Sequence, residues 1–147
     1  MKNRIMDAYK RAMLNKDDDR KRVINTLRAE MKNKEIELRT SGKELADADI
    51  LSLIQKMIKQ NRDAIKMFEE GGRQDLVENN QKEIAILEEF LPKQLTNDEV
   101  DALIKQEIEL NGYNSMKDMG KIMATFKNNY SGQCDMGYVS KKIKEML

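Results

Sequence analysis

Apolar residues recur every three or four positions along almost the whole chain of 147 residues, and a single proline, Pro92, interrupts the pattern. This spacing places apolar side chains on one face of an α-helix. Because proline is the residue that breaks a helix most strongly, long helices can continue through most of this sequence. The sequence therefore predicts an all-α fold in which several amphipathic helices bury their apolar faces against one another.

Residues 1–91 are expected to form an N-terminal region of long amphipathic helices. Asp17 or Asp18 can cap the second helix and Asp47 or Asp49 the third, because a short acidic side chain accepts from free backbone amides. Glycine pairs are typical of helix ends, and the residue before a proline avoids the α conformation. The expected breaks are residues 15–19, Ser41-Gly42, Gly71-Gly72 and Pro92.

Residues 92–147 are expected to form a separate, small three-helix unit that follows the boundary at Leu91-Pro92. Polar residues that can cap a helix precede each of its apolar stretches. They are Thr96 with Glu99, Ser115 with Asp118, and Asp135, with a loop over 128–133. Three methionines at helical spacing are expected to fill the core of this unit, because methionine fits irregular gaps. They are Met116, Met119 and Met123.

The net charge of +1 conceals an uneven distribution along the chain. Residues 1–43 hold 13 basic and 7 acidic side chains, whereas residues 44–92 hold 6 basic and 11 acidic ones. One interpretation is that the two segments pack together and neutralise each other. The other is that the first segment carries a basic patch for an acidic partner such as RNA.

Four basic side chains of the second expected helix favour the patch. On a helix they fall within about 40° of one another, at the flank of the apolar face. They are Lys21, Arg28, Lys32 and Arg39, and we call them the basic stripe.

Several kinds of catalytic site are excluded by the residues that the chain lacks. It has no histidine, and hence no Ser-His-Asp or Cys-His arrangement. It also has no glycine-rich phosphate loop and no second cysteine to complete a metal site. The one cysteine, Cys134, stands near a probable helix start, which could lower its pKa, but it has no resolving partner. We expect no catalytic residue, no metal and no cofactor.

The sequence also predicts a cytoplasmic protein without a membrane span. A lone cysteine forms no internal disulfide, which is typical of a reducing compartment. No apolar run approaches the length that a membrane span requires. Asp7 and the three aspartates at 17–19 are not typical of a transit peptide.

Three stretches of the chain, taken in order, are similar to those of a known family. They are Asp19–Ile24 with Leu27 and Arg28, then Glu83–Thr96 with Glu99, and Asp118–Met123 followed by Gly132 and Asp135. Together they resemble the GatB/YqeY family over nearly the whole chain. The resemblance falls most clearly on Pro92, Gln94, Leu95, Asp118, Gly120, Lys121, Gly132 and Asp135, which we call the motif residues.

This resemblance implies a two-part helical protein whose second part is similar to the tail of the B subunit of the tRNA-dependent amidotransferase. That enzyme amidates Glu or Asp on a mischarged tRNA, with glutamine as the nitrogen donor. Its tail contacts tRNA, whereas its kinase and glutaminase sites lie elsewhere. The resemblance thus implies an association with carbon–nitrogen ligase activity rather than the activity itself.

The segment before Asp135 differs from the family pattern. The family usually has a proline and basic residues before the late glycine, a lysine after it, and then an aspartate-glycine pair. Here Asn128, Asn129 and Tyr130 precede the glycine, and Met136 follows the aspartate. If this loop contacts RNA in the family, the contact should be weaker here, because each lost phosphate contact removes counterion release.

Three functions remain open from the sequence. The first is a non-catalytic tRNA-binding or amidotransferase-accessory protein, in which phosphates contact the basic stripe and four late lysines. These are Lys121, Lys141, Lys142 and Lys144. The second is a helical module that binds another protein subunit through an apolar face. The third is a glutamine-dependent carbon–nitrogen ligase. The first function requires the stripe to be exposed and continuous with the late lysines, rather than covered by the acidic residues 44–92.

Overall fold

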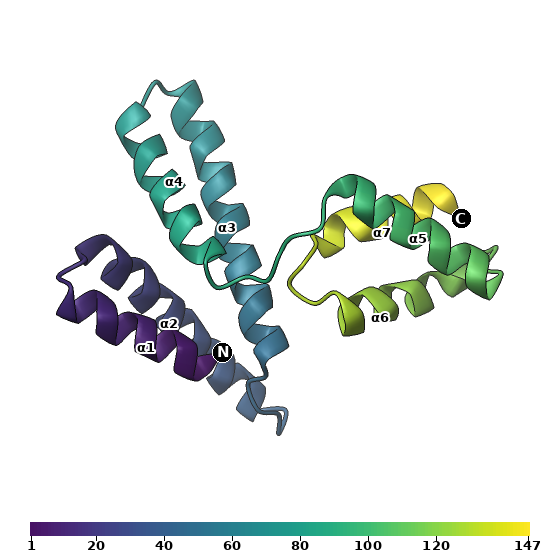
Figure 1. Ribbon diagram of the computed structural model, residues 1–147, viewed down its shortest axis with the longest axis horizontal. Coiled ribbons are helices and arrows are strands. Elements are labelled where there is room, and N and C mark those ends of the chain that lie inside the picture. Colours follow the sequence, from purple (N-terminus) through teal and green to yellow (C-terminus); the bar gives the residue numbers. More distant parts are fainter. The chain divides into compact units, whose positions relative to one another are not determined.

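The computed structural model describes residues 1–147, and all of its regular elements are helical (Figure 1). This confirms the predicted all-α fold. The elements are α1 (Lys2–Leu14), α2 (Asp18–Arg39), α3 (Asp47–Glu70), α4 (Gln74–Glu88), α5 (Asn97–Asn111), the short 3-10 helix η1 (Met116–Asp118), α6 (Met119–Asn129) and α7 (Met136–Met146). They form two compact units, Met1–Leu91 and Pro92–Leu147. No helix is long and apolar enough to cross a membrane.

In the N-terminal unit, α1 pairs with α2 and α3 pairs with α4, each pair joined by a short turn (Figure 1). Asp17 caps α2, because its carboxylate accepts from the backbone N–H of Arg20 at 3.2 Å. Asp49 accepts from the backbone N–H of Ala46 at 2.9 Å, at the start of α3. Gly72 has a φ of +69° in the turn between α3 and α4, a conformation that glycine adopts without strain.

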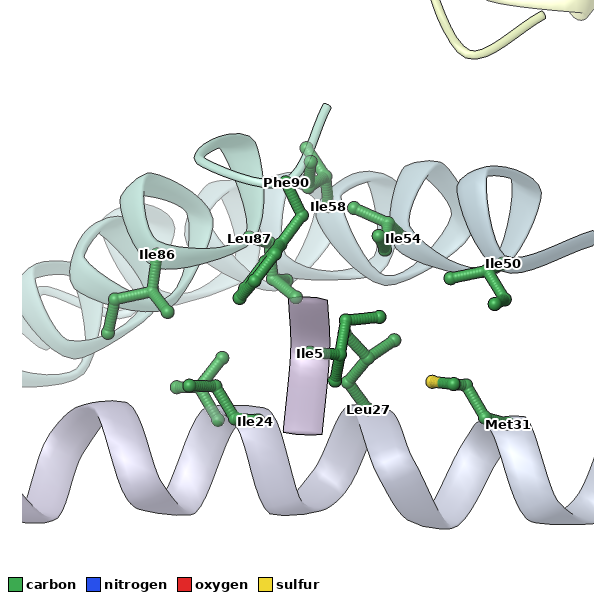
Figure 2. Packing of buried hydrophobic residues seen from close by; sticks show 11 residues of the cluster. Ile5, Ile24, Leu27, Met31, Ile50, Ile54, Ile58, Ile86, Leu87 and Phe90 are labelled. Atoms are coloured by element: carbon green, nitrogen blue, oxygen red, sulfur yellow. The ribbon is translucent and has the colours of Figure 1, made fainter. Parts of the chain in front are cut away.

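The core of this unit is aliphatic and draws on all four helices. Figure 2 shows Ile24, Leu27 and Met31 pointing from α2 toward α3 and α4, with Ile5 of α1 among them. Each such side chain contributes about 1.5–3 kcal/mol when it is fully buried. The buried members are Ile5, Val23, Ile24, Leu27, Met31, Ile50, Ile54, Ile58, Ile86, Leu87 and Phe90.

The C-terminal unit packs α5, α6 and α7 around a smaller core. The Thr96 hydroxyl accepts from the Glu99 backbone N–H at 3.2 Å, and the Asp135 carboxylate accepts from that of Gly137 at 2.9 Å. Both caps were predicted and are confirmed. The buried members of this core are Val100, Ile104, Ile122, Phe126, Cys134, Val139 and Ile143.

Two details of this unit differ from the prediction. The helix expected to open at Ser115 is split, because a 3-10 turn over Met116–Asp118 precedes α6. Helix α6 then continues to Asn129, which shortens the expected loop. Met119 and Met123 pack against the core as predicted, but Met116 is 50% exposed and the prediction is wrong for it, because the 3-10 turn holds it outside the core.

Candidate functional site

The basic stripe lies on α2 and is not covered by the acidic segment. Lys21, Lys32 and Arg39 are exposed, and none of the four stripe side chains pairs with a residue in 44–92. Arg28 is half-buried, with its guanidinium carbon 4.4 Å from the centre of the Tyr9 ring of α1. Contact with an aromatic face fixes the orientation of the planar guanidinium. The stripe thus meets the first part of the condition, which is that the acidic segment does not cover it, whereas its continuity with the late lysines stays a prediction.

Other arginines neutralise the acidic segment instead. Arg20 donates to both carboxylate oxygens of Glu89, and Arg4 donates to the Glu89 backbone oxygen at 2.6 Å. Arg22 lies 3.8 Å from the carboxylate of Glu83. The hydrogen bonds from Arg20 hold the pKa of Glu89 below its ordinary value, although partial burial opposes them. Part of the neutralisation that the first interpretation expects therefore occurs, through arginines beside the stripe and not through the stripe itself.

Three of the four stripe residues line a groove between α1 and the second half of α2. The groove has a volume of about 560 Å³, within the range of small-ligand sites. Its wall has exposed apolar side chains beside the charged ones, because Met6 is 37% exposed and Ile36 50% exposed. The lining residues are Lys2, Asn3, Ile5, Met6, Asn25, Arg28, Ala29, Met31, Lys32, Glu35, Ile36 and Arg39.

The groove carries an excess of positive charge. It contains four cations and one anion, Glu35. The carboxylate of Glu35 lies 3.4 Å from Lys2 Nζ and 3.5 Å from a guanidinium nitrogen of Arg39. The Lys32 ammonium has no ion pair at all, and the groove therefore attracts anionic groups.

Sequence reasoning found the stripe but missed the groove. Lys2 and Asn3 come from α1, and no local pattern couples them to α2. Ile36 did leave a signal, because at 100° per residue it lies about 180° from Leu27. This signal was weak, because single apolar residues are common on the solvent face of a helix and only a contiguous patch indicates a binding surface.

The late lysines lie in the C-terminal unit, and two of them are paired. Lys121 Nζ lies 3.7 Å from the Asp118 carboxylate, and Lys142 Nζ lies 3.7 Å from that of Asp101. The charge of Asp101 raises the pKa of Lys142. Lys141 and Lys144 are exposed on α7 without ion pairs. These lysines are thus less available to a partner than their number suggests.

The structure brings together motif residues that lie far apart in the sequence. The Gln94 amide donates to the backbone oxygens of Gly132 at 2.6 Å and Pro92 at 2.9 Å. The backbone N–H of Leu95 donates to the Gln133 oxygen at 2.7 Å. These bonds fix the segment before α5 against the turn between α6 and α7, where Gly132 has a φ of +75°. This cluster has a structural explanation.

The cap predicted at Asp118 is not formed, and the motif residue Gly120 packs against no neighbouring element. Asp118 makes no side-chain cap on α6 and instead accepts from the backbone N–H of Asn114 at 3.4 Å. Gly120 is exposed, and a Cβ added there would meet no atom within 4 Å. Tight packing therefore does not explain this glycine. The motif residue Asp135, in contrast, is a helix cap.

Cys134 is buried in the core of the C-terminal unit and is 4% exposed. Burial and the nearby charge of Asp135 raise its pKa, so the suggestion that a helix start lowers this pKa is wrong. A buried, protonated thiol is a poor nucleophile. No group of three His, Cys, Asp or Glu side chains is placed to hold a metal ion.

Comparison with known proteins gives consistent matches. The sequence model of the family described as Yqey-like protein matches residues 2–147. A protein of Pyrenophora tritici-repentis, named altered inheritance of mitochondria protein 41, mitochondrial, is 31% identical over 151 residues, which cover 98% of this chain and 79% of that protein. Proteins of the same name match from Lachancea thermotolerans (42% identity, 56% of this chain) and Kluyveromyces lactis (39%, 66%). The chain spans 43% and 52% of the lengths of these two relatives.

The names of these relatives correct the predicted location. We expected a cytoplasmic protein, but the matched proteins are named as mitochondrial. The prediction is wrong, and it depended on a lone cysteine, the absence of a long apolar run, and aspartates near the N-terminus that are not typical of a transit peptide. The first two features fit any aqueous, reducing compartment and do not distinguish the cytoplasm from the interior of a mitochondrion.

Proposed function

Because this chain belongs to the YqeY-like family, we propose that it is a non-catalytic accessory protein that binds tRNA through the basic stripe of α2. The observation that carries the proposal is that the stripe faces solvent or the groove rather than the acidic segment. Its charges are exposed or held in a groove, and no carboxylate of the acidic segment neutralises them. The phosphates of a folded RNA are the abundant anions that such a row of cations attracts.

The contacts expected are to phosphates rather than to base pairs. Four cations spaced along 19 residues of one helix can contact several phosphates, because Lys21 to Arg39 extends about 27 Å at 1.5 Å per residue. Contacts of this kind position a protein on RNA and recognise its shape. The exposed Lys141 and Lys144 of the C-terminal unit are proposed to add weaker contacts.

An amidotransferase subunit is the proposed protein partner, following the family resemblance. In that arrangement, the catalytic residues belong to the partner and this chain contributes only RNA contacts. The proposal therefore places the amide-forming chemistry outside this chain.

The test is binding to bulk tRNA over a series of salt concentrations. One variant reverses the stripe: Lys21→Glu, Arg28→Glu, Lys32→Glu and Arg39→Glu. We expect the wild-type affinity to fall steeply with salt. A plot of the logarithm of the affinity against the logarithm of the salt concentration should have a negative slope of about 0.7–0.9 for each phosphate contacted. The stripe variant should lose at least tenfold in affinity at low salt, with its helical circular dichroism unchanged.

A matched control reverses four lysines of α3 and α4 that are exposed and have no ion pair: Lys56→Glu, Lys59→Glu, Lys66→Glu and Lys82→Glu. The control variant changes the net charge of the chain by the same amount as the stripe variant, so it separates a local site from a general charge effect. The control should lose less than threefold. Equal losses in both variants, or no binding of tRNA by the wild type at low salt, would refute the proposal.

A further inference from the structure

The groove between α1 and α2 has more than the charge that phosphates require. Its cations stand beside an apolar wall that includes Met6, Ala29 and Ile36. Half of the Ile36 side chain is open to solvent, although isoleucine gains free energy from burial. A duplex keeps the flat faces of its bases stacked inside and offers phosphates, sugars and base edges at its surface, so it would leave this apolar wall uncovered. A ligand that matches the groove has anionic and flat apolar parts side by side.

An unstacked nucleotide has these properties. Its phosphates are anionic, and the faces of its base are apolar once it leaves a helical stack. The groove volume of about 560 Å³ suits a small ligand of this kind rather than a whole duplex.

Arg28 and two amides supply the directional contacts. Arg28 lines the groove, and its guanidinium is already held against the Tyr9 ring. A fixed guanidinium plane is a surface on which RNA bases stack. Asn3 and Asn25 also line the groove, and their side chains make no hydrogen bond within the protein. An amide both donates and accepts, as the polar edge of a base requires.

We propose that this groove binds an unstacked nucleotide of single-stranded RNA, with the base against Ile36 and Met6 and a flanking phosphate on Lys32, beside Lys2 and Arg39, which share Glu35. This inference rests on the proposed function and adds to it the part of the RNA that is bound. In a tRNA, the ligand would be a loop or the single-stranded end.

The experiment compares a fluorescent single-stranded RNA with a duplex that has the same number of phosphates, measured by anisotropy. The wild type should bind the single strand at least fivefold more tightly. The variant Ile36→Ser should lose about fivefold for the single strand, since it removes the burial of the exposed half of the isoleucine side chain against the base, and nothing for the duplex. Its salt slope should not change, because no phosphate contact is lost.

Two further variants make the result specific. Lys32→Gln should lower the salt slope by about 0.7, which Ile36→Ser should not do. Met67→Ser removes an exposed apolar side chain of α3, outside the groove, and should leave both affinities unchanged.

The outcomes separate this inference from the proposed function. Equal affinity for single strand and duplex, with the stripe still required, would overturn the nucleotide site and leave the RNA-binding function intact. Loss of affinity for both RNAs in Ile36→Ser would also overturn it. No RNA binding at all, together with binding of an acidic amphipathic peptide, would overturn both and assign the groove to a protein partner.

Discussion

The surface cations of the two units differ in the partners that they contact. In the N-terminal unit, Arg4, Arg20 and Arg22 contact the acidic helix pair, while the neighbouring stripe stays without a carboxylate from that pair. In the C-terminal unit, Lys121 and Lys142 are paired within their own unit. The four stripe residues and the four late lysines are equal in number, but this does not mean equal binding capacity. The comparison teaches that the number of unpaired cations is a better guide to an interface than the total number of cations.

The units also differ in the size of their cores. The N-terminal core contains eleven buried residues, all but Phe90 and Met31 branched aliphatic, whereas the C-terminal core contains seven and includes one large aromatic ring, Phe126. A small core depends more heavily on each member, because little other buried area remains when one is lost. The C-terminal unit should thus be the more sensitive to a single substitution.

The largest expected effect comes from Phe126→Ala, which should cost about 3–5 kcal/mol in the free energy of unfolding. The matched change in the other unit is Leu27→Ala, with an expected cost of about 2–5 kcal/mol. Hydrogen exchange should show Phe126→Ala removing protection from α5–α7 while α1–α4 stay protected, and Leu27→Ala doing the reverse. If each variant exposes both units together, the comparison of two separate cores fails.

A smaller effect should follow from Glu89→Gln, which removes the ion pair with Arg20. Glu89 is about half exposed, so the loss should be at most about 1 kcal/mol. Its pKa is lowered in the folded state from an ordinary 4.5, so this stabilisation is fully present above that pH and is lost as the pH falls through the folded value.

Chemical denaturation at several pH values measures this difference. The gap in unfolding free energy between wild type and Glu89→Gln should be constant near neutral pH and shrink below about pH 4.5. Glu88→Gln is the control, because Glu88 has a single contact with Arg62 at 3.4 Å. A gap that does not depend on pH would show that the carboxylate charge of Glu89 contributes nothing.

The smallest effect, and the only stabilising one, is expected from Gly120→Ala. Gly120 lies in the first turn of α6 with free space around it, so alanine should raise the stability of the C-terminal unit by about 0.5 kcal/mol. Gly132→Ala should instead destabilise it by about 1 kcal/mol, because the φ at that position is +75°. Thermal melts of the two variants measure both signs. A lower melting temperature for Gly120→Ala would mean that its backbone conformation, rather than its surface, requires glycine.

The helices themselves were predictable from the sequence, because their signals are local. Apolar spacing located all seven, and the caps at Thr96 and Asp135 were identified from residue type alone. One helix boundary was not predictable in this way. The 3-10 turn at Met116–Asp118 divides a segment whose apolar spacing continues across the division. Periodicity does not distinguish a tight turn from the first turn of an α-helix.

By itself, the sequence determined an all-α chain, the composition of each helix face and the presence of a basic stripe, since each depends on residues within a few turns of one another. Only the tertiary structure decided which charges stay unpaired. It also brings residues of α1 and α2 together in one groove, among them Lys2, Asn3, Met6, Arg28, Lys32 and Ile36. The physical reason is that ion pairs and grooves form between helices. Their geometry follows from how the buried faces pack, and no local pattern encodes it.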